Sequence, residues 1–282
     1  MISNPADTSA TAGFEIRVIV AAYNEAPHIG ATLDALAVTF PNATVWVGDD
    51  GSTDATAAIA RRAGARVVCS ERMVGKGAAV TLAARDAVQD AWNARARTYA
   101  RVPDRKSNRT NVDAGDGAVV AGGGASGAEP LGGGAALPDE PIFVLCDGDL
   151  AESAGRLGAL VDAVQGGEAD MAVAAFATRV GGGLGLAVAF ARWAIRRRCG
   201  LQLRAPISGQ RALRAGTLAD VLPFASGFGM EIGMTIDAAR AGHRIAEVEL
   251  DLSHRATGRT LSGFAHRGRQ LVDFVRVYIA RR

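Results

Sequence analysis

The sequence predicts a single α/β domain in which a mostly parallel β-sheet is flanked by helices. Segments with strand-like and helix-like patterns alternate along the chain, which is typical of a parallel sheet covered by helices. Three of the apolar, strand-like runs end abruptly in polar clusters. The chain has 282 residues, of which 49% are hydrophobic and 21% charged, and this composition suits one large globular domain.

The first half of the chain follows the alternation regularly. Ile29, Leu33 and Leu36 recur at helical spacing, and Pro27 is tolerated in the first turn of a helix, so a helix is expected between the first two strands. Gly64 is a suitable residue to end the next helix. The expected elements are strands at 16–21, 45–48 and 65–69, and helices from about 24 to 37, up to 63, and from 77 to about 96.

Residues 97–139 interrupt the alternation. They contain two runs of three glycines and almost no large apolar side chains, so we expect a flexible insertion without a core, or alternatively a mobile lid. Residues 1–13 are expected to be a flexible N-terminus and 14–282 to form the domain. The later expected elements are strands from 142, at 171–175 and at 245–252, and helices at 156–164, at 184–199 and from 227 onward.

The overall composition excludes several classes of protein. A net charge of +2 and an aromatic content of 5% argue against a nucleic-acid-binding protein. The three cysteines show neither metal-ligand spacing nor a disulfide framework, and Cys69 and Cys146 are expected to be buried in strands. The sequence has no recognisable signal peptide and no apolar stretch long enough to span a bilayer. We therefore expect a cytoplasmic protein whose membrane contact, if it has one, is peripheral and at the inner face.

Two aspartates follow the strand that starts at Ile142. Asp147 and Asp149 are separated by Gly148, and alternate residues of a strand share a face, so the two carboxylates can point the same way. The carboxyl end of a parallel strand is where open α/β sheets bind ligands, and carboxylate oxygens suit a hard divalent cation. The alternative is an Asp-Gly turn that merely ends the strand.

The other two polar strand ends contain Tyr23 and Asp50. Because parallel strands bring such ends to one edge of the sheet, Tyr23, Asp50 and Asp149 are expected to lie in one site. An aromatic face, a hydrogen-bond acceptor and a metal position together suit a nucleoside diphosphate.

At this point the sequence resembles the family 2 glycosyltransferases, which have the Rossmann-like GT-A fold. The resemblance is carried, in this order, by Val18–Glu25, by Val47–Asp54 and by Asp147-Gly148-Asp149. It implies that Asp50 binds the nucleobase and that Asp147 and Asp149 form the family's Asp-x-Asp motif, with Asp149 as the direct metal ligand. Further donor contacts are expected from Ala21, Tyr23 and Glu25.

A Gly-Lys-Gly sequence precedes the third predicted helix. Gly75-Lys76-Gly77 is not a Walker P-loop, because the upstream glycine and the following Ser or Thr are missing. It is either an ordinary loop with an exposed lysine or a phosphate contact at a helix N-terminus. Similar transferases carry Gly-Lys-Gly here, and this resemblance favours a phosphate contact for Lys76.

The segment at 184–199 is amphipathic and ends in Arg196-Arg197-Arg198. It is either a surface helix whose cations suit the C-terminal dipole or an acceptor site at a membrane surface. Prenyl-phosphate glycosyltransferases resemble the chain here, because they continue into a Ser-Gly-x-Arg motif, which is Ser208-Gly209-Gln210-Arg211 in this sequence. The resemblance implies a binding role for Arg211.

The last third of the chain resembles glucosyl-3-phosphoglycerate synthases at Met230-Glu231-Ile232-Gly233 and at His254-Arg255. Glu231 is expected to bind a sugar hydroxyl or act as a base, the alternative being favourable pairing with a helix N-terminus. His254 is expected to be a third metal ligand beside Asp147 and Asp149. Arg255 and Arg259 are expected to neutralise the departing diphosphate.

These observations lead to one main hypothesis. We expect a Mg²⁺- or Mn²⁺-dependent glycosyltransferase that uses a nucleotide diphosphate sugar, with Asp149 and Glu231 as catalytic residues. Family frequency favours a uridine nucleotide. The acceptor is expected to bear a phosphate or a hydroxyl, as a prenyl phosphate does. The alternatives are transfer to a small soluble acid, synthesis of the activated sugar by a nucleotidyltransferase, and non-catalytic nucleotide-sugar binding. A homodimer is also expected.

Overall fold

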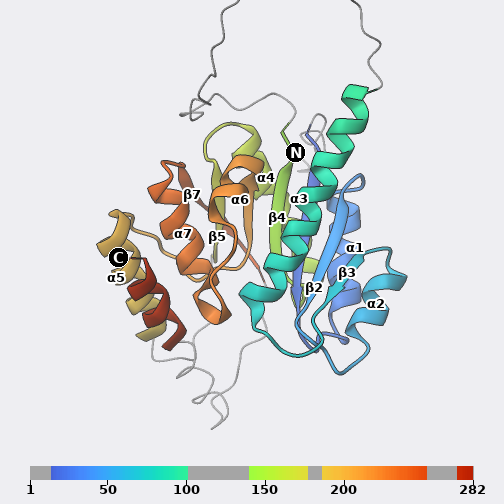
Figure 1. The fold of residues 1–282 in the computed structure, drawn as a ribbon, viewed down its shortest axis with the longest axis horizontal. Coiled ribbons are helices and arrows are strands. Elements are labelled where there is room, and N and C mark those ends of the chain that lie inside the picture. The colour runs from blue at the N-terminus through green and yellow to red at the C-terminus, as the bar shows by residue number, and fades with distance from the viewer. Residues whose placement is uncertain (1–13, 101–139, 177–185, 253–271, 282) are drawn as a thin grey trace, which may run out of the picture.

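The computed structural model describes residues 14–100, 140–176, 186–252 and 272–281. Seven strands form one sheet in the order β3-β2-β1-β4-β6-β5-β7, in which β6 is antiparallel to both neighbours and the other pairs are parallel. This mixed, mostly parallel sheet flanked by helices confirms the predicted α/β class (Figure 1). The strands are β1 Ile16–Ala22, β2 Thr44–Asp49, β3 Arg66–Cys69, β4 Ile142–Asp147, β5 Met171–Phe176, β6 Arg211–Arg214 and β7 Ile245–Leu250.

Helices cover both faces of the sheet. The α-helices are α1 Ile29–Thr39, α2 Thr56–Arg62, α3 Lys76–Ala100, α4 Gly158–Gln165, α5 Leu186–Cys199, α6 Ala215–Val221 and α7 Met230–Arg240. Two 3₁₀-helices, η1 Ala151–Leu157 and η2 Gly227–Gly229, lead into α4 and α7, and a C-terminal helix occupies 272–280. The long helix α3 crosses one face beside β1 and β2 (Figure 1).

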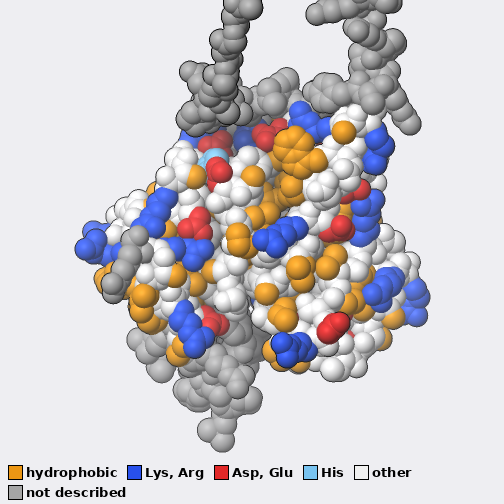
Figure 2. All heavy atoms as spheres, viewed as in Figure 1, with side chains coloured by type: hydrophobic (Ala, Val, Ile, Leu, Met, Phe, Trp, Pro, Cys, Tyr) orange, Lys and Arg blue, Asp and Glu red, His pale blue; other side chains and the backbone are white. Residues whose placement is uncertain are grey.

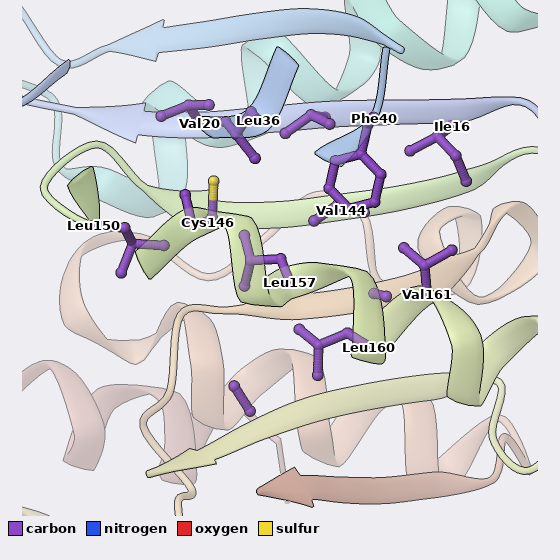
Figure 3. Close-up of a cluster of buried hydrophobic side chains, with 14 of the residues drawn as sticks. Ile16, Val20, Leu36, Phe40, Val144, Cys146, Leu150, Leu157, Leu160 and Val161 are labelled. Carbon is purple, nitrogen blue, oxygen red and sulfur yellow. The ribbon is translucent and has the colours of Figure 1, made fainter. Parts of the chain in front are cut away.

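Alternate residues of the central strands enter two separate cores. Val18 and Val20 of β1 pack with side chains from α1, η1 and α4, whereas Ile19 packs on the other face with side chains from α3 and α7. Figure 3 shows the first of these cores, in which Leu36 of α1 and Leu157 of η1 lie over β1 and β4. Since β1 and β4 are buried on both faces, their sequences are almost continuously apolar, as the sequence pattern indicated.

The structure differs from the expected elements in several places. β6 and α6 were not expected, because β6 is only four residues long and has an arginine at each end. α1 begins at Ile29, since the preceding residues form a turn in which Glu25 O accepts hydrogen bonds from the backbone N–H groups of His28 and Ile29. α3 continues to Ala100, so the break expected at residue 97 comes later.

Other expectations concern the remaining segments. Cys146 is buried as expected, but Cys69 is exposed, because β3 is the edge strand of the sheet. The expected N-terminal tail at 1–13 and most of the expected insertion, 101–139, lie outside the described residues. None of the helices in the described ranges combines the length and the apolar character needed to cross a membrane.

Candidate functional site

The carboxyl ends of the three central strands meet as the sequence predicted. Ala21 of β1 lies in register with Gly48 of β2 and with Asp147 of β4. Beyond the strands, Gly148 N–H donates to Ala21 O at 2.8 Å, and Asp50 N–H donates to Ala22 O at 3.0 Å. The backbone of β1 therefore holds both acidic strand ends, one on each side.

Asp50 fixes the loop that leads into α3. Its Oδ1 accepts hydrogen bonds from Val74 N–H at 2.6 Å and from Gly75 N–H at 2.9 Å. Gly75 has a φ of +94°, a left-handed conformation that favours glycine. The buried carboxylate thus positions Lys76, the next residue, while a carboxylate has about four acceptor sites and can still bind another donor.

Lys76 joins two acidic side chains from distant parts of the sequence. Its Nζ lies 2.7 Å from Asp147 Oδ1 and 2.8 Å from Glu231 Oε1. Burial disfavours the ammonium ion, but the two carboxylates outweigh burial and raise the pKa of Lys76 well above its ordinary value. Lys76 is therefore charged throughout the physiological pH range.

The segment before β6 completes the surroundings of Asp147. Gln210 Nε2 donates to Asp147 Oδ2 at 2.9 Å, and Ser208 Oγ donates to Gln210 Oε1 at 3.1 Å. A Cβ added to Gly209 would lie 2.7 Å from Lys76 Nζ and 2.8 Å from Asp147 Oδ2. A side chain at position 209 would therefore have to displace the Lys76–Asp147 ion pair.

The helices that carry Lys76 and Glu231 start close to one another. A Cβ added to Gly77, in the first turn of α3, would lie 1.9 Å from Ala225 O in the segment before η2. Glu231 stands in the first turn of α7 and is 5% exposed. The absence of a side chain at Gly77 thus allows the contact between the two helix starts that brings Lys76 to Glu231.

Thr32 of α1 braces the turn that contains Asp149. Its buried Oγ1 donates to Gly148 O at 2.8 Å and accepts from Ala151 N–H at 2.9 Å, so it bonds the residues on both sides of Asp149. The sequence analysis missed Thr32, because a threonine on the buried face of a helix carries no functional signal. It also missed Gln210, although this residue lies inside the Ser-Gly-x-Arg motif.

We predict that Thr32→Val lowers turnover about tenfold or more, because small displacements of a reacting geometry are costly. The valine removes both hydrogen bonds and should also destabilise the fold by about 1–3 kcal/mol. Steady-state kinetics and urea denaturation measure the two effects. Thr39→Val, in the same helix but more exposed, is the matched control and should leave turnover unchanged. Parental turnover in folded Thr32→Val protein would refute the bracing role.

Arg211 lies in a different environment from the one that the resemblance implied. The side chain is fully buried, and its guanidinium donates to Ser208 O at 3.0 Å and to Thr235 Oγ1 at 3.0 Å. Burial lowers the pKa of Arg211 to about 10. Since Thr235 Oγ1 also donates to Glu231 O, Arg211 supports the first turn of α7, and this structure gives a ligand no access to it.

The residues after β1 lie beside the second strand end. Tyr23 is 41% exposed, so its ring is accessible to a ligand. Glu25 N–H donates to Thr56 Oγ1 at 2.8 Å, and Asn24 N–H donates to Ser52 Oγ at 2.9 Å. Asn24 and Glu25 are thus attached to the segment that follows Asp50, and Tyr23 directly precedes them.

The donor set at the end of β4 fits a hard divalent cation. Asp147 and Asp149 are both partly exposed, whereas Gly148 between them is buried, and two carboxylates supply the oxygen ligands that Mg²⁺ and Mn²⁺ favour. The described residues contain no group of three or more acidic, histidine or cysteine side chains placed to hold a metal. The expected third ligand, His254, and the expected diphosphate contacts Arg255 and Arg259 lie outside the described residues.

Part of the chain is similar in sequence to known proteins. Residues 17–94, which run from β1 through β3 into most of α3, match the model of glycosyl transferase family 2. Protein RfbJ of Shigella flexneri is 41% identical over 64 residues, which are 23% of this chain and 49% of RfbJ. The chain therefore spans about half the length of this curated relative.

Solved structures match a much larger part of the chain. Glucosyl-3-phosphoglycerate synthase from Mycobacterium tuberculosis, in complex with Mn²⁺, UDP and glucosyl-3-phosphoglycerate, has a TM-score of 0.61 and 25% identity. The match covers 95% of this chain and 79% of the synthase. Its complex with Mn²⁺, UDP and phosphoglyceric acid gives a TM-score of 0.62 at 24% identity. Within residues 17–94 the chain is thus similar to glycosyltransferase family 2, and its fold is the GT-A fold of the matched synthase structures.

Proposed function

We propose that the protein is a metal-dependent glycosyltransferase that moves a sugar from a nucleotide diphosphate sugar to a phosphate-bearing acceptor. The observation that carries this proposal is the cluster of Lys76, Asp147 and Glu231 at the sheet edge, next to the strand end that bears Asp50. The cluster combines acidic groups for a cation with a charged lysine for phosphate, and both stabilise a nucleoside diphosphate that leaves the sugar.

Each residue of the proposed site has a separate task. Asp149 and Asp147 would hold the divalent cation with His254 as the third ligand, and a bound cation would supply positive charge that stabilises the leaving diphosphate. The positive charges of Lys76, Arg255 and Arg259 would further stabilise the leaving diphosphate. The free acceptor sites of Asp50 bind an N–H of the nucleobase, next to the exposed ring of Tyr23.

The chemistry of the acceptor decides the task of Glu231. A phosphate oxygen is already ionised, so its attack on the sugar needs no strong base. A hydroxyl acceptor has to lose its proton, and Glu231 is then the base. The hydrogen bond that Glu231 Oε1 accepts from Lys76 at 2.8 Å holds the carboxylate beside Asp147, where such a base would act.

Uridine is the proposed nucleoside, and Mn²⁺ or Mg²⁺ the proposed cation. The support comes from the M. tuberculosis synthase, whose structures contain Mn²⁺ together with UDP or UDP-glucose. Complexes of this synthase with Mn²⁺ and UDP-glucose also contain phosphoglyceric acid or glycerol 3-phosphate, which favours a small phosphorylated acceptor. A cytoplasmic location and a homodimer remain part of the proposal.

A prenyl phosphate is the second candidate acceptor, and one surface of the structure favours it. α5 and the C-terminal helix pack together through Trp193 and Tyr278, whose ring centroids are 4.8 Å apart (Figure 1). Trp193 and Ile279 are each 51% exposed, and Arg196 and Arg197 are exposed on the same face of α5 as Trp193. Figure 2 shows basic and apolar side chains mixed over this part of the molecule. Such a surface suits the interface of an anionic membrane.

A transfer assay tests the proposed function and separates the two acceptors. We expect the protein with Mn²⁺ and UDP-glucose, or another UDP-sugar, to glycosylate either 3-phosphoglycerate in solution or a prenyl phosphate in vesicles. The product is identified by mass spectrometry, and EDTA should abolish its formation. A chain that binds UDP-sugars but transfers to neither acceptor, and hydrolyses none of the donors, would support the non-catalytic alternative instead.

A further inference from the structure

Both carboxylate oxygens of Asp147 bind donors that the chain itself provides. Lys76 Nζ lies 2.7 Å from Oδ1, and Gln210 Nε2 donates to Oδ2 at 2.9 Å. The two donors differ in charge, because the amide of Gln210 is neutral, whereas the ammonium of Lys76 carries a full positive charge. A metal ion that approaches Asp147 therefore meets a cation that already neutralises the carboxylate.

Lys76 is able to leave Asp147 and still have a carboxylate beside its positive charge. The lysine is about a quarter exposed, with 26% of its side chain accessible, and its flexible stem permits movement of the ammonium. Glu231 Oε1, 2.8 Å from Nζ, is a second carboxylate that remains available when the contact with Asp147 is broken. Gln210, in contrast, is fully buried and fixed by Ser208, so it keeps Asp147 in place.

We propose that Lys76 is an exchangeable internal cation of this site, which the divalent metal displaces from Asp147. This inference rests on the proposed function, since it uses the metal site at Asp147 and Asp149. The displaced ammonium stays near Glu231 and becomes available to the diphosphate of the donor. Glu231 is then a positioning residue for Lys76 in addition to any role as a base.

The exchange makes the affinities for metal and nucleotide depend on one another through Lys76. Before the nucleotide binds, the metal must compete with the ammonium. Once a diphosphate is bound, the displaced ammonium gains a new anionic partner, so the metal binds more tightly. By linkage, the metal must raise the affinity for the nucleotide by the same factor.

Binding of Mn²⁺ alone, measured by electron paramagnetic resonance without any nucleotide, tests the proposal. We expect Lys76→Met to bind Mn²⁺ about tenfold more tightly than the parent, because a positive charge a few ångströms from the metal is removed. Lys76→Arg retains the charge and should bind Mn²⁺ as the parent does. Arg62→Met makes the same change of charge on the exposed surface of α2 and should change the affinity less than about twofold, since distant charges are screened.

A double-mutant cycle then tests the part played by Glu231. Glu231→Gln removes the alternative partner of Lys76, so the ammonium stays on Asp147 and the affinity for Mn²⁺ should fall. In the Lys76→Met background the same change should have a clearly smaller effect, and the difference between the two effects measures the coupling. Added UDP should raise the affinity for Mn²⁺ more in the parent than in Lys76→Met.

The outcomes separate this inference from the proposed function. If folded Lys76→Met binds Mn²⁺ no more tightly than the parent, the exchange is refuted while the proposed metal site stands. If the parent binds no Mn²⁺ with or without UDP, the metal-dependent function itself fails. Equal effects of Glu231→Gln in both backgrounds would remove Glu231 from the exchange.

Discussion

Replacement of Asp149 by alanine should lower turnover about 10²-fold or more, the size of effect expected when a group that stabilises transition-state charge is removed. Asp149 follows β4 at the edge where the three central strands end, and Thr32 braces the residues on both sides of it. The loss should appear mainly in kcat, because the cation that Asp149 holds acts most strongly on the charge of the departing diphosphate.

Two measurements make the Asp149 result specific. Mn²⁺ binding should be lost together with turnover, whereas the thermal unfolding midpoint should change little, because Asp149 is partly exposed. Asp34→Ala, an exposed aspartate on α1, removes the same charge away from the sheet edge and should retain parental activity. Full turnover by Asp149→Ala with metal still bound would refute the assignment of Asp149 as the direct ligand.

Gly77→Ala should cause the largest loss of stability among the glycine substitutions near the site. The new Cβ would lie 1.9 Å from Ala225 O, a backbone atom, so one of the two helix starts must move. Overpacking of this kind costs about 3 kcal/mol. Since the movement also separates Lys76 from Glu231, the remaining folded protein should show reduced activity.

Urea denaturation tests this prediction by comparing the free energies of unfolding of Gly77→Ala and of a matched variant, Gly30→Ala. Gly30, like Gly77, is the second residue of an α-helix, but a Cβ at position 30 would meet nothing closer than Ile59 Cγ2 at 3.6 Å. Gly30→Ala should therefore be neutral or stabilise the protein by up to about 1 kcal/mol, because alanine has the higher helix propensity. Equal stability of the Gly77→Ala and Gly30→Ala proteins would contradict the close contact between α3 and the segment before η2.

The strand ends were predictable because their pattern is local. Apolar runs that stop at Asp50 and Asp147 identify buried parallel strands, and the rule that such strands end at one edge brings their acidic residues together. The family resemblance depended on the same segments. Each of these patterns is contained in fewer than ten consecutive residues, so it could be recognised without knowing how distant segments pack.

Contacts between distant segments were not predictable in this way. Lys76 and Glu231 are 155 positions apart, and packing of the start of α3 against the segment before α7, including Gly77 against Ala225, brings them together. Arg211 was given a binding role because its motif resembles that of other transferases, but its burial depends on the antiparallel strand β6, which the sequence did not indicate. A four-residue strand with an arginine at each end has too few apolar positions to show the two-residue period of a strand.

The most direct test of the central claim is a crystal grown with Mn²⁺ and UDP and measured for anomalous scattering. The proposed function predicts an anomalous peak within bonding distance of Asp149, with the diphosphate on the other side of the metal and Lys76 turned toward its phosphates. An anomalous peak and nucleotide density located away from the ends of β1, β2 and β4 would contradict it.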